Sequence, residues 1–161
     1  MPLMNVTPRL YVDSSVIAGC CDPHYTLWTR SLLQDFQKGL YRPFISTLVQ
    51  AEMADAPRHV LEAYAELLRC EPKIINVSEK ADVLADLYIE RKVLDPGYYF
   101  DALHVALATL EEVDVFVSLD HPHMLHFAQV RGFVTVNIEL GLKPIQIRCP
   151  RLVASHDRES Y

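Results

Sequence analysis

Residues 10–19 read "LYVDSSVIAG", an apolar run that ends on a carboxylate and continues with two hydroxyls. The run from 9 to 13 has the length and composition of a short buried strand, with Asp13 as its last residue. An Asp in this place caps the helix that starts near Ser14 and Ser15, because Asp accepts backbone N–H bonds at helix starts. If a serine caps instead, the carboxylate faces a cleft above the sheet, and these residues alone leave both interpretations open.

The rest of the chain alternates between strand-like and helical patterns. Further strands are expected at 42–46, 73–77, 114–118 and 133–136, and helices at 24–38, 47–70 with an interruption at Pro57, 79–92 and 101–112. The segment "KPIQIRCP" alternates apolar and polar side chains, which predicts a late edge strand. Since parallel strands need crossover connections of helix length, the pattern predicts an α/β class, a three-layer α/β/α fold with a central mainly parallel sheet.

The composition is that of an ordinary globular chain of 161 residues, for which we expect one domain over residues 1–154 and a polar tail over 155–161. The net charge of −6 argues against binding of nucleic acid through bulk positive charge, so any such contact must be local or metal-assisted. The four cysteines lack C-x-x-C spacing, and no stretch is typical of export or of a membrane span. These features predict a cytoplasmic protein.

Two acidic residues accompany predicted helix starts. "STLVQAEM" carries Thr47 and Gln50 in a capping-box pattern, which starts a helix at about residue 48 and leaves Glu52 in its second turn, beyond any capping need. Asp101 opens "DALHVALATLEE", which is apolar nearly all round and must therefore be buried. There Asp101 is either an N-cap or a charge whose desolvation needs a partner or a cation.

A further acid, Asp120, follows the predicted strand 114–118 by two residues and so mirrors the place of Asp13. Sites in open α/β sheets form outside the carboxyl ends of the strands. If the four carboxylates converge there, their like charges repel, and a divalent cation resolves the conflict. Hard oxygen ligands select Mg²⁺ or Mn²⁺, and such a cation suits attack on a phosphodiester, because it orients water and offsets charge on the phosphate.

The series "YVDSSVIAG", "STLVQAEM", "DALHVALAT" and "VFVSLDHPHM" resembles a PIN domain, and most of all the VapC-like toxin ribonucleases of prokaryotic toxin–antitoxin pairs. With "VRGFVTVNIELGLKPIQIRCP", which is similar to the closing segment of one branch of that family, the likeness spans roughly residues 9–150. It implies a Mg²⁺- or Mn²⁺-dependent endoribonuclease, the toxin of a type II pair, with RNA as substrate. It also implies a homodimer and a separate antitoxin protein. The catalytic and metal-binding residues implied are Asp13, Glu52, Asp101 and Asp120.

The resemblance assigns auxiliary roles as well. Ser14 and Ser118 would hold water or a carboxylate by hydrogen bonds. His104 stands at one apolar position of the "D-A-h-h-A" helix, where h is apolar, and this is a common choice in the branch that the chain resembles. The fourth motif departs from that branch, which often has Trp and Asn where this chain has Leu119 and Asp120.

Other functions fit parts of the sequence. The main alternative is a catalytically inactive PIN-like module that binds RNA or a protein partner. His121, His123 and His126 are clustered as zinc or copper ligands are, although Pro122 disturbs their spacing. A dehalogenase-like phosphatase needs a second Asp where Ser15 stands, and a serine hydrolase needs a G-x-S-x-G elbow that the chain lacks.

Overall fold

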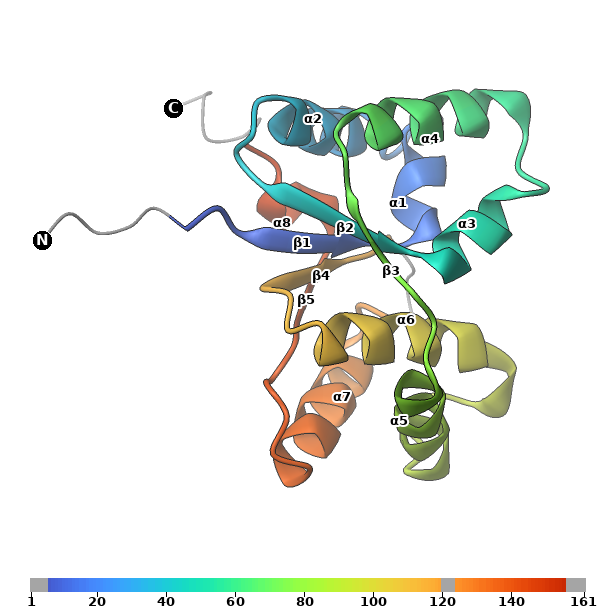
Figure 1. Ribbon diagram of the computed structural model, residues 1–161, viewed down its shortest axis with the longest axis vertical. Helices are drawn as coiled ribbons and strands as arrows, with labels where there is room; N and C mark the ends of the chain where they lie inside the picture. Colours follow the sequence, from blue (N-terminus) through green and yellow to red (C-terminus); the bar gives the residue numbers. More distant parts are fainter. Residues whose placement is uncertain (1–5, 120–123, 156–161) are drawn as a thin grey trace, which may run out of the picture.

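The computed structural model describes residues 6–119 and 124–155 and has a parallel β-sheet at its centre (Figure 1). The strand order is β3-β2-β1-β4-β5, and every neighbouring pair is parallel, with Tyr11 in register with Phe44 on one side and Phe116 on the other. The predicted α/β class is therefore confirmed. The strands are β1 (Arg9–Val12), β2 (Arg42–Ser46), β3 (Lys73–Ile75), β4 (Val115–Val117) and β5 (Gln146–Arg148).

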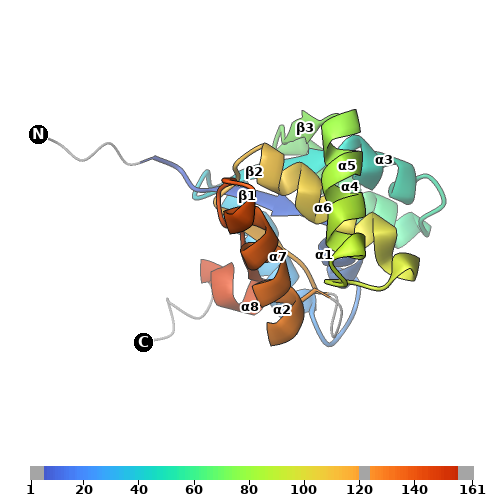
Figure 2. The same ribbon diagram turned by 90° about the horizontal axis from the view of Figure 1, so that it is seen from below.

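Helices connect the strands and cover both faces of the sheet. Strand side chains alternate between two cores, since Tyr11 packs with α5, α6 and α7, whereas Leu10 and Val12 pack with α1, α2 and α4. Figure 2 shows α5, α6 and α7 together on one side. The helices are α1 (Ser14–Gly19), α2 (Thr26–Gln37), α3 (Thr47–Met53), α4 (Arg58–Arg69), α5 (Glu79–Glu90), a 3-10 turn η1 (Pro96–Tyr98), α6 (Tyr99–Leu110), α7 (Phe127–Glu139) and α8 (Pro150–Val153).

The predicted strand at 133–136 is wrong, because this segment lies inside α7. Its β-branched residues favour a strand by propensity, but Val130, Phe133 and Val136 recur at helical spacing and pack on the α5–α6 core. Gly141, with a φ of +72°, stands just past the end of this helix. Tertiary packing of one helix face therefore overrides the local preference.

The predicted late edge strand is confirmed, since β5 lies at one edge of the sheet and β3 at the other. Beyond α8, Ser155 is held in place by the buried Asp35, which accepts bonds from its backbone N–H and its hydroxyl. Within the described part of the chain, no helix combines the length and apolar character that a bilayer crossing requires.

Helices α6 and α7 both start at the carboxyl edge of the sheet, the edge where the strands end. The residue after α6, Glu111, pairs with Lys73 at the beginning of β3. Lys143, which follows α7, bonds to Asp114 just before β4. Since these helix ends lie at the amino edge of the sheet, the helix starts lie at the opposite edge, where functional loops gather in such folds.

Candidate functional site

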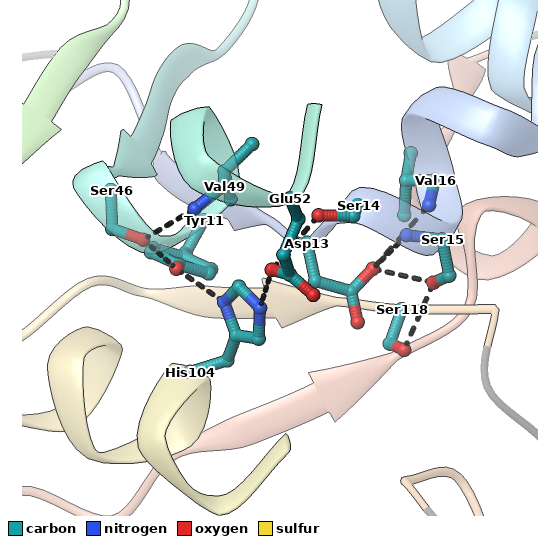
Figure 3. Close-up of polar contacts among 10 residues, drawn as sticks. All are labelled: Tyr11, Asp13, Ser14, Ser15, Val16, Ser46, Val49, Glu52, His104 and Ser118. Atoms are coloured by element: carbon teal, nitrogen blue, oxygen red, sulfur yellow. Dashed lines mark hydrogen bonds and ion pairs between the residues drawn. The ribbon is translucent and has the colours of Figure 1, made fainter. Parts of the chain in front are cut away.

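Asp13 directly follows β1 and caps α1. Its backbone is extended, and Oδ1 accepts bonds from the backbone N–H groups of Ser15 (3.1 Å) and Val16 (3.3 Å) and from the Ser15 hydroxyl (Figure 3). The capping interpretation is therefore confirmed, and the neighbouring serines do not replace Asp13 in this role. The cap also fixes the carboxylate at the carboxyl end of the central strand, so capping and a site role are compatible.

The environment of Asp13 disfavours its charge. Only 4% of the residue is exposed, and burial raises the pKa of its carboxyl. The nearby His104 and hydrogen bonds from Ser118 and Ser15 act in the opposite direction without cancelling the effect of burial. Among the described residues, no Lys or Arg forms an ion pair with Asp13. A cation beside this carboxylate would offset the desolvation of its charge.

Glu52 lies in the second turn of α3, as the sequence predicts, but the cap of this helix differs from the prediction. Ser46 is the N-cap, and its hydroxyl accepts a bond from the backbone N–H of Val49 (3.3 Å). Thr47 is the first helical residue, and its hydroxyl accepts a bond from the N–H of Val77 (3.1 Å). The capping box was wrong by one residue because "ST" offers two adjacent hydroxyls and the pattern alone does not choose between them.

Two side chains from other elements hold the Glu52 carboxylate. Ser14, next to Asp13 in the chain, donates to Oε1 at 3.0 Å, and His104 Nε2 lies 2.5 Å from the same oxygen. Burial acts to raise the pKa of this carboxyl, but the bond and charge of His104, with the bond from Ser14, outweigh it and lower the pKa. Glu52 is therefore ionised at neutral pH, in a place set by α1 and α6.

His104 belongs to a buried chain of hydrogen bonds (Figure 3). Its Nδ1 lies 2.7 Å from the Tyr11 hydroxyl, which lies 2.7 Å from the Ser46 hydroxyl. Burial raises the pKa of Tyr11, so its O–H remains a donor. In every assignment that satisfies these bonds, Nε2–H donates to Glu52. A neutral imidazole accepts from Tyr11 at Nδ1 while Ser46 donates to Tyr11, and an imidazolium donates from Nδ1 to Tyr11, which then donates to Ser46. This series of hydrogen bonds links β1, β2, α3 and α6. Asp13 follows β1, Glu52 lies in α3 and Asp101 lies in α6, so the bonds connect the elements that position three of the predicted site residues.

Asp101 lies in the first turn of α6, where Tyr98 is the N-cap, so Asp101 does not cap the helix. It is half-buried and precedes His104 by three residues, which places the two on neighbouring positions of the helix surface. Ser118, fully buried after β4, brings its hydroxyl to 3.3 Å from the Ser15 hydroxyl. The structure thus places Asp101 and Ser118 at the same edge of the sheet as Asp13 and Glu52.

Some predicted residues lie outside the described part of the chain, namely Asp120, His121 and His123. His126 is described, and it caps α7 by accepting a bond from the Ala128 N–H at Nδ1 (3.2 Å). This contact gives His126 a structural role.

Four residues that organise the site received no role from the sequence, which are Tyr11, Ser15, Ser46 and His104, although the motifs that the chain resembles include Ser15 and His104. His104 had the clearest signal, because it is a polar residue three positions after a candidate ligand in an otherwise apolar helix. Tyr11 reads as an ordinary strand residue, and only the packing of α6 on β1 reveals its bond to His104.

The site offers oxygen donors of the kind that Mg²⁺ and Mn²⁺ prefer. Asp13 supplies one carboxylate and Glu52, which accepts a bond from Ser14, supplies another, and Asp13 forms no ion pair with a Lys or Arg among the described residues. Across residues 6–119 and 124–155, however, no group of three or more His, Cys, Asp and Glu side chains is arranged to hold a metal ion. The donor chemistry therefore fits a hard cation, and the described residues supply part of a ligand set.

The architecture is a three-layer α/β/α fold with a central parallel sheet. No protein-family model matches the chain, and no curated protein matches it. Among solved structures it is similar to a chain of VapBC2 from Rickettsia felis, crystallised bound to a DNA fragment from its promoter. The TM-score is 0.53 at 14% sequence identity, and the match covers 88% of this chain and 98% of that one. This likeness confirms the predicted fold, while function must be argued from the site.

Proposed function

We propose that the protein is a metal-dependent endoribonuclease, a hydrolase that acts as the toxin of a type II toxin–antitoxin pair. The observation that carries the proposal is the buried Asp13 carboxylate at the carboxyl edge of a parallel sheet, without a Lys or Arg partner among the described residues. Its chain neighbour Ser14 donates a hydrogen bond to Glu52. The structural similarity to VapBC2 supports the toxin–antitoxin assignment.

The proposed ligands of Mg²⁺ or Mn²⁺ are Asp13, Glu52, Asp101 and Asp120, with the last outside the described residues. When bound, the cation would supply an activated water and offset charge on the scissile phosphate. The chain itself provides the positioning. His104 and Ser14 hold one oxygen of Glu52, and Ser15 and the backbone of α1 hold Oδ1 of Asp13. Fixed carboxylates need little reorganisation during the reaction.

The proposal includes partners and a location. We infer that a separate antitoxin protein binds this chain, which the VapBC2 complex supports, that the chain forms a homodimer, and that it acts in the cytoplasm. Size-exclusion chromatography with light scattering tests the dimer, since a strict monomer at micromolar concentration contradicts it. Purification of the tagged chain after expression with its neighbouring gene products tests the antitoxin.

The experiment that tests the activity compares the wild type with Asp13→Asn, purified in parallel. We expect Mn²⁺-dependent cleavage of RNA by the wild type, loss of that cleavage with EDTA, and a drop of about 100-fold or more in the variant, on the order of losing one electrostatic catalytic group. Equal residual cleavage by both proteins assigns it to a contaminant and refutes the proposal. RNA binding without cleavage by the wild type identifies the inactive module instead.

A further inference from the structure

The phenylalanines of the chain divide sharply by exposure. Four of the six are buried, with exposed fractions from 0 to 6%: Phe36, Phe44, Phe116 and Phe133. The other two are open to solvent, Phe100 at 60% and Phe127 at 75%. An aromatic side chain left in water forgoes the free energy of burial, so two such exposures in one small protein need an explanation.

Both exposed rings lie at the edge that carries the candidate site. Phe100 is the second residue of α6, directly before Asp101, and lies four residues before His104, which contacts Glu52. Phe127 is the first residue of α7. Both helices start at the carboxyl edge of the sheet, as their opposite ends contact Lys73 and Asp114 at the amino edge.

Phe127 also lines a groove that opens beside the site. The groove runs between α7 and the end of β5, and its wall includes Leu125, Arg148 and Leu152. Arg148 is in register with Val117, and its carbonyl accepts a bond from the N–H of Ser118 (3.1 Å). The groove therefore begins one strand away from Ser118 and two strands from Asp13, about 10 Å by the usual spacing of strands.

The surroundings of Phe127 suit an anionic ligand with flat, apolar parts, and Phe100 offers a restricted ring face. Phe127 lies between the exposed Arg148 and Arg131, one turn further along α7, and neither arginine forms an ion pair with any described residue. Phe100 packs edge-on against Tyr99 with ring centroids 5.7 Å apart, and the Tyr99 hydroxyl donates to Asp82 at 2.7 Å. Because Tyr99 is anchored in this way, it restricts the Phe100 ring, so that less conformational entropy of this ring is lost when a ligand binds.

We propose that Phe100 and Phe127 are stacking platforms for unpaired bases of single-stranded RNA, with Arg148 contacting a phosphate between the groove and the site. The proposal rests on the proposed ribonuclease function and specifies its substrate class. Bases of a duplex are hidden in the stack, whereas a single strand presents their faces to aromatic side chains. The platforms thus select unpaired RNA without requiring a particular sequence.

The test measures binding in an Asp13→Asn background, so that cleavage does not interfere. The probe is a fluorescein-labelled, unstructured 12-nucleotide RNA, followed by anisotropy. Phe100→Ala and Phe127→Ala are each expected to raise the Kd by roughly 5- to 100-fold, the range for loss of one stacked base. Phe→Trp at either position should retain affinity. Ile138→Ala, which truncates a 58% exposed side chain at the other end of α7, is the matched control and should leave the Kd unchanged.

Two further probes separate stacking from other contacts. An abasic strand of equal length should bind the Phe variants and the parent with equal affinity, and a duplex of the same sequence should bind more weakly than the single strand. Equal Kd values of parent and both Phe→Ala variants for the single strand overturn the proposal and favour a protein partner on this surface. Because binding is measured without cleavage, this result is distinct from a wild type that fails to cut RNA, which refutes the proposed function alone.

Discussion

Asp13 and Glu52 are two carboxylates whose environments move their pKa values in opposite directions. Burial raises the pKa of Asp13, whereas His104 and Ser14 outweigh burial and lower that of Glu52. Opposed environments of this kind are typical of sites in which two acids have different roles. Glu52 is ionised at neutral pH and can bind a cation, while Asp13 needs a positive neighbour to hold its charge.

Replacing His104 tests the support that it gives Glu52. His104→Ala removes a partner of both Glu52 and the buried Tyr11 hydroxyl, so we expect a loss of about 1–3 kcal/mol in the free energy of unfolding. We also expect kcat/KM to fall about 10- to 100-fold and the Mn²⁺ concentration for half-maximal cleavage to rise, as for other residues that orient a metal ligand.

The control for this prediction is His104→Gln, which keeps a donor and should recover part of the activity. Thermal unfolding and a Mn²⁺ titration of cleavage separate the two effects. A variant with reduced stability but an unchanged Mn²⁺ requirement would show that His104 serves the fold alone.

Removing the buried charge of Asp13 should stabilise the metal-free protein. Asn caps a helix as well as Asp does, and its oxygen can accept the same bonds from Ser15 and Val16. Metal-free Asp13→Asn should therefore unfold at a higher Tm than the metal-free wild type, by about 2–4 °C for each kcal/mol gained.

The measurement is thermal unfolding in EDTA and again with millimolar Mg²⁺. Mg²⁺ should raise the Tm of the wild type and leave that of Asp13→Asn nearly unchanged, because only a ligand that binds the folded state stabilises it. A metal-free variant that melts below the metal-free wild type contradicts the prediction.

Helix and strand boundaries could be predicted where periodicity and turn chemistry agree. The run before Asp13 and the apolar helix around Val105 met no conflict, and both were placed correctly. The segment from Phe133 to Val136 failed because β-branched composition and helical spacing disagree there, and only the core that receives the helix decides between them.

Asp114, just before β4, links the start of β1 to the loop that follows α7. Its carboxylate accepts a bond from the Arg9 N–H (2.7 Å) and one from Lys143 (3.4 Å). Burial alone would raise its pKa, but these bonds and charges lower it below the usual value of 3.8. A lowered folded-state pKa gives stability that is present above pH 3.8 and is lost as the pH falls through the folded value.

We expect Asp114→Ala to reduce the free energy of unfolding at pH 7 by about 0.5–1.5 kcal/mol, most of it from the Arg9 bond, since the side chain is 41% exposed and its ion pairs are screened by water. Urea unfolding at pH 7 and at pH 3 measures the difference. The gap between variant and wild type should narrow at pH 3, and a gap that widens there contradicts the assignment.

Taken together, the molecule shows why the site was harder to predict than the fold. Alternating strands and helices bring Asp13 and the start of α6 to one edge by topology, and the sequence carries that information locally. His104 is separated in the sequence from Glu52 by 52 positions and from Tyr11 by 93 positions, so no local pattern encodes the bonds between them. Long-range polar contacts of this kind emerge only from packed helices.

The net charge of −6 leads to a last prediction, which concerns how the binding of RNA depends on salt. Binding of single strands weakens with salt by a slope of about −0.7 per phosphate contacted. An acidic protein whose two arginines beside Phe127 form no ion pair with any described residue should contact few phosphates. In the Asp13→Asn background we expect a slope of log affinity against log salt of about −1 to −2 between 50 and 200 mM, reduced by about 0.7 in Arg148→Ala. A slope steeper than about −4 would instead indicate a broad basic surface, which the charge distribution of this chain does not predict. The expected shallow slope would mean that affinity depends on the Phe100 and Phe127 stacks more than on charge, because stacking is far less sensitive to salt than phosphate contacts are.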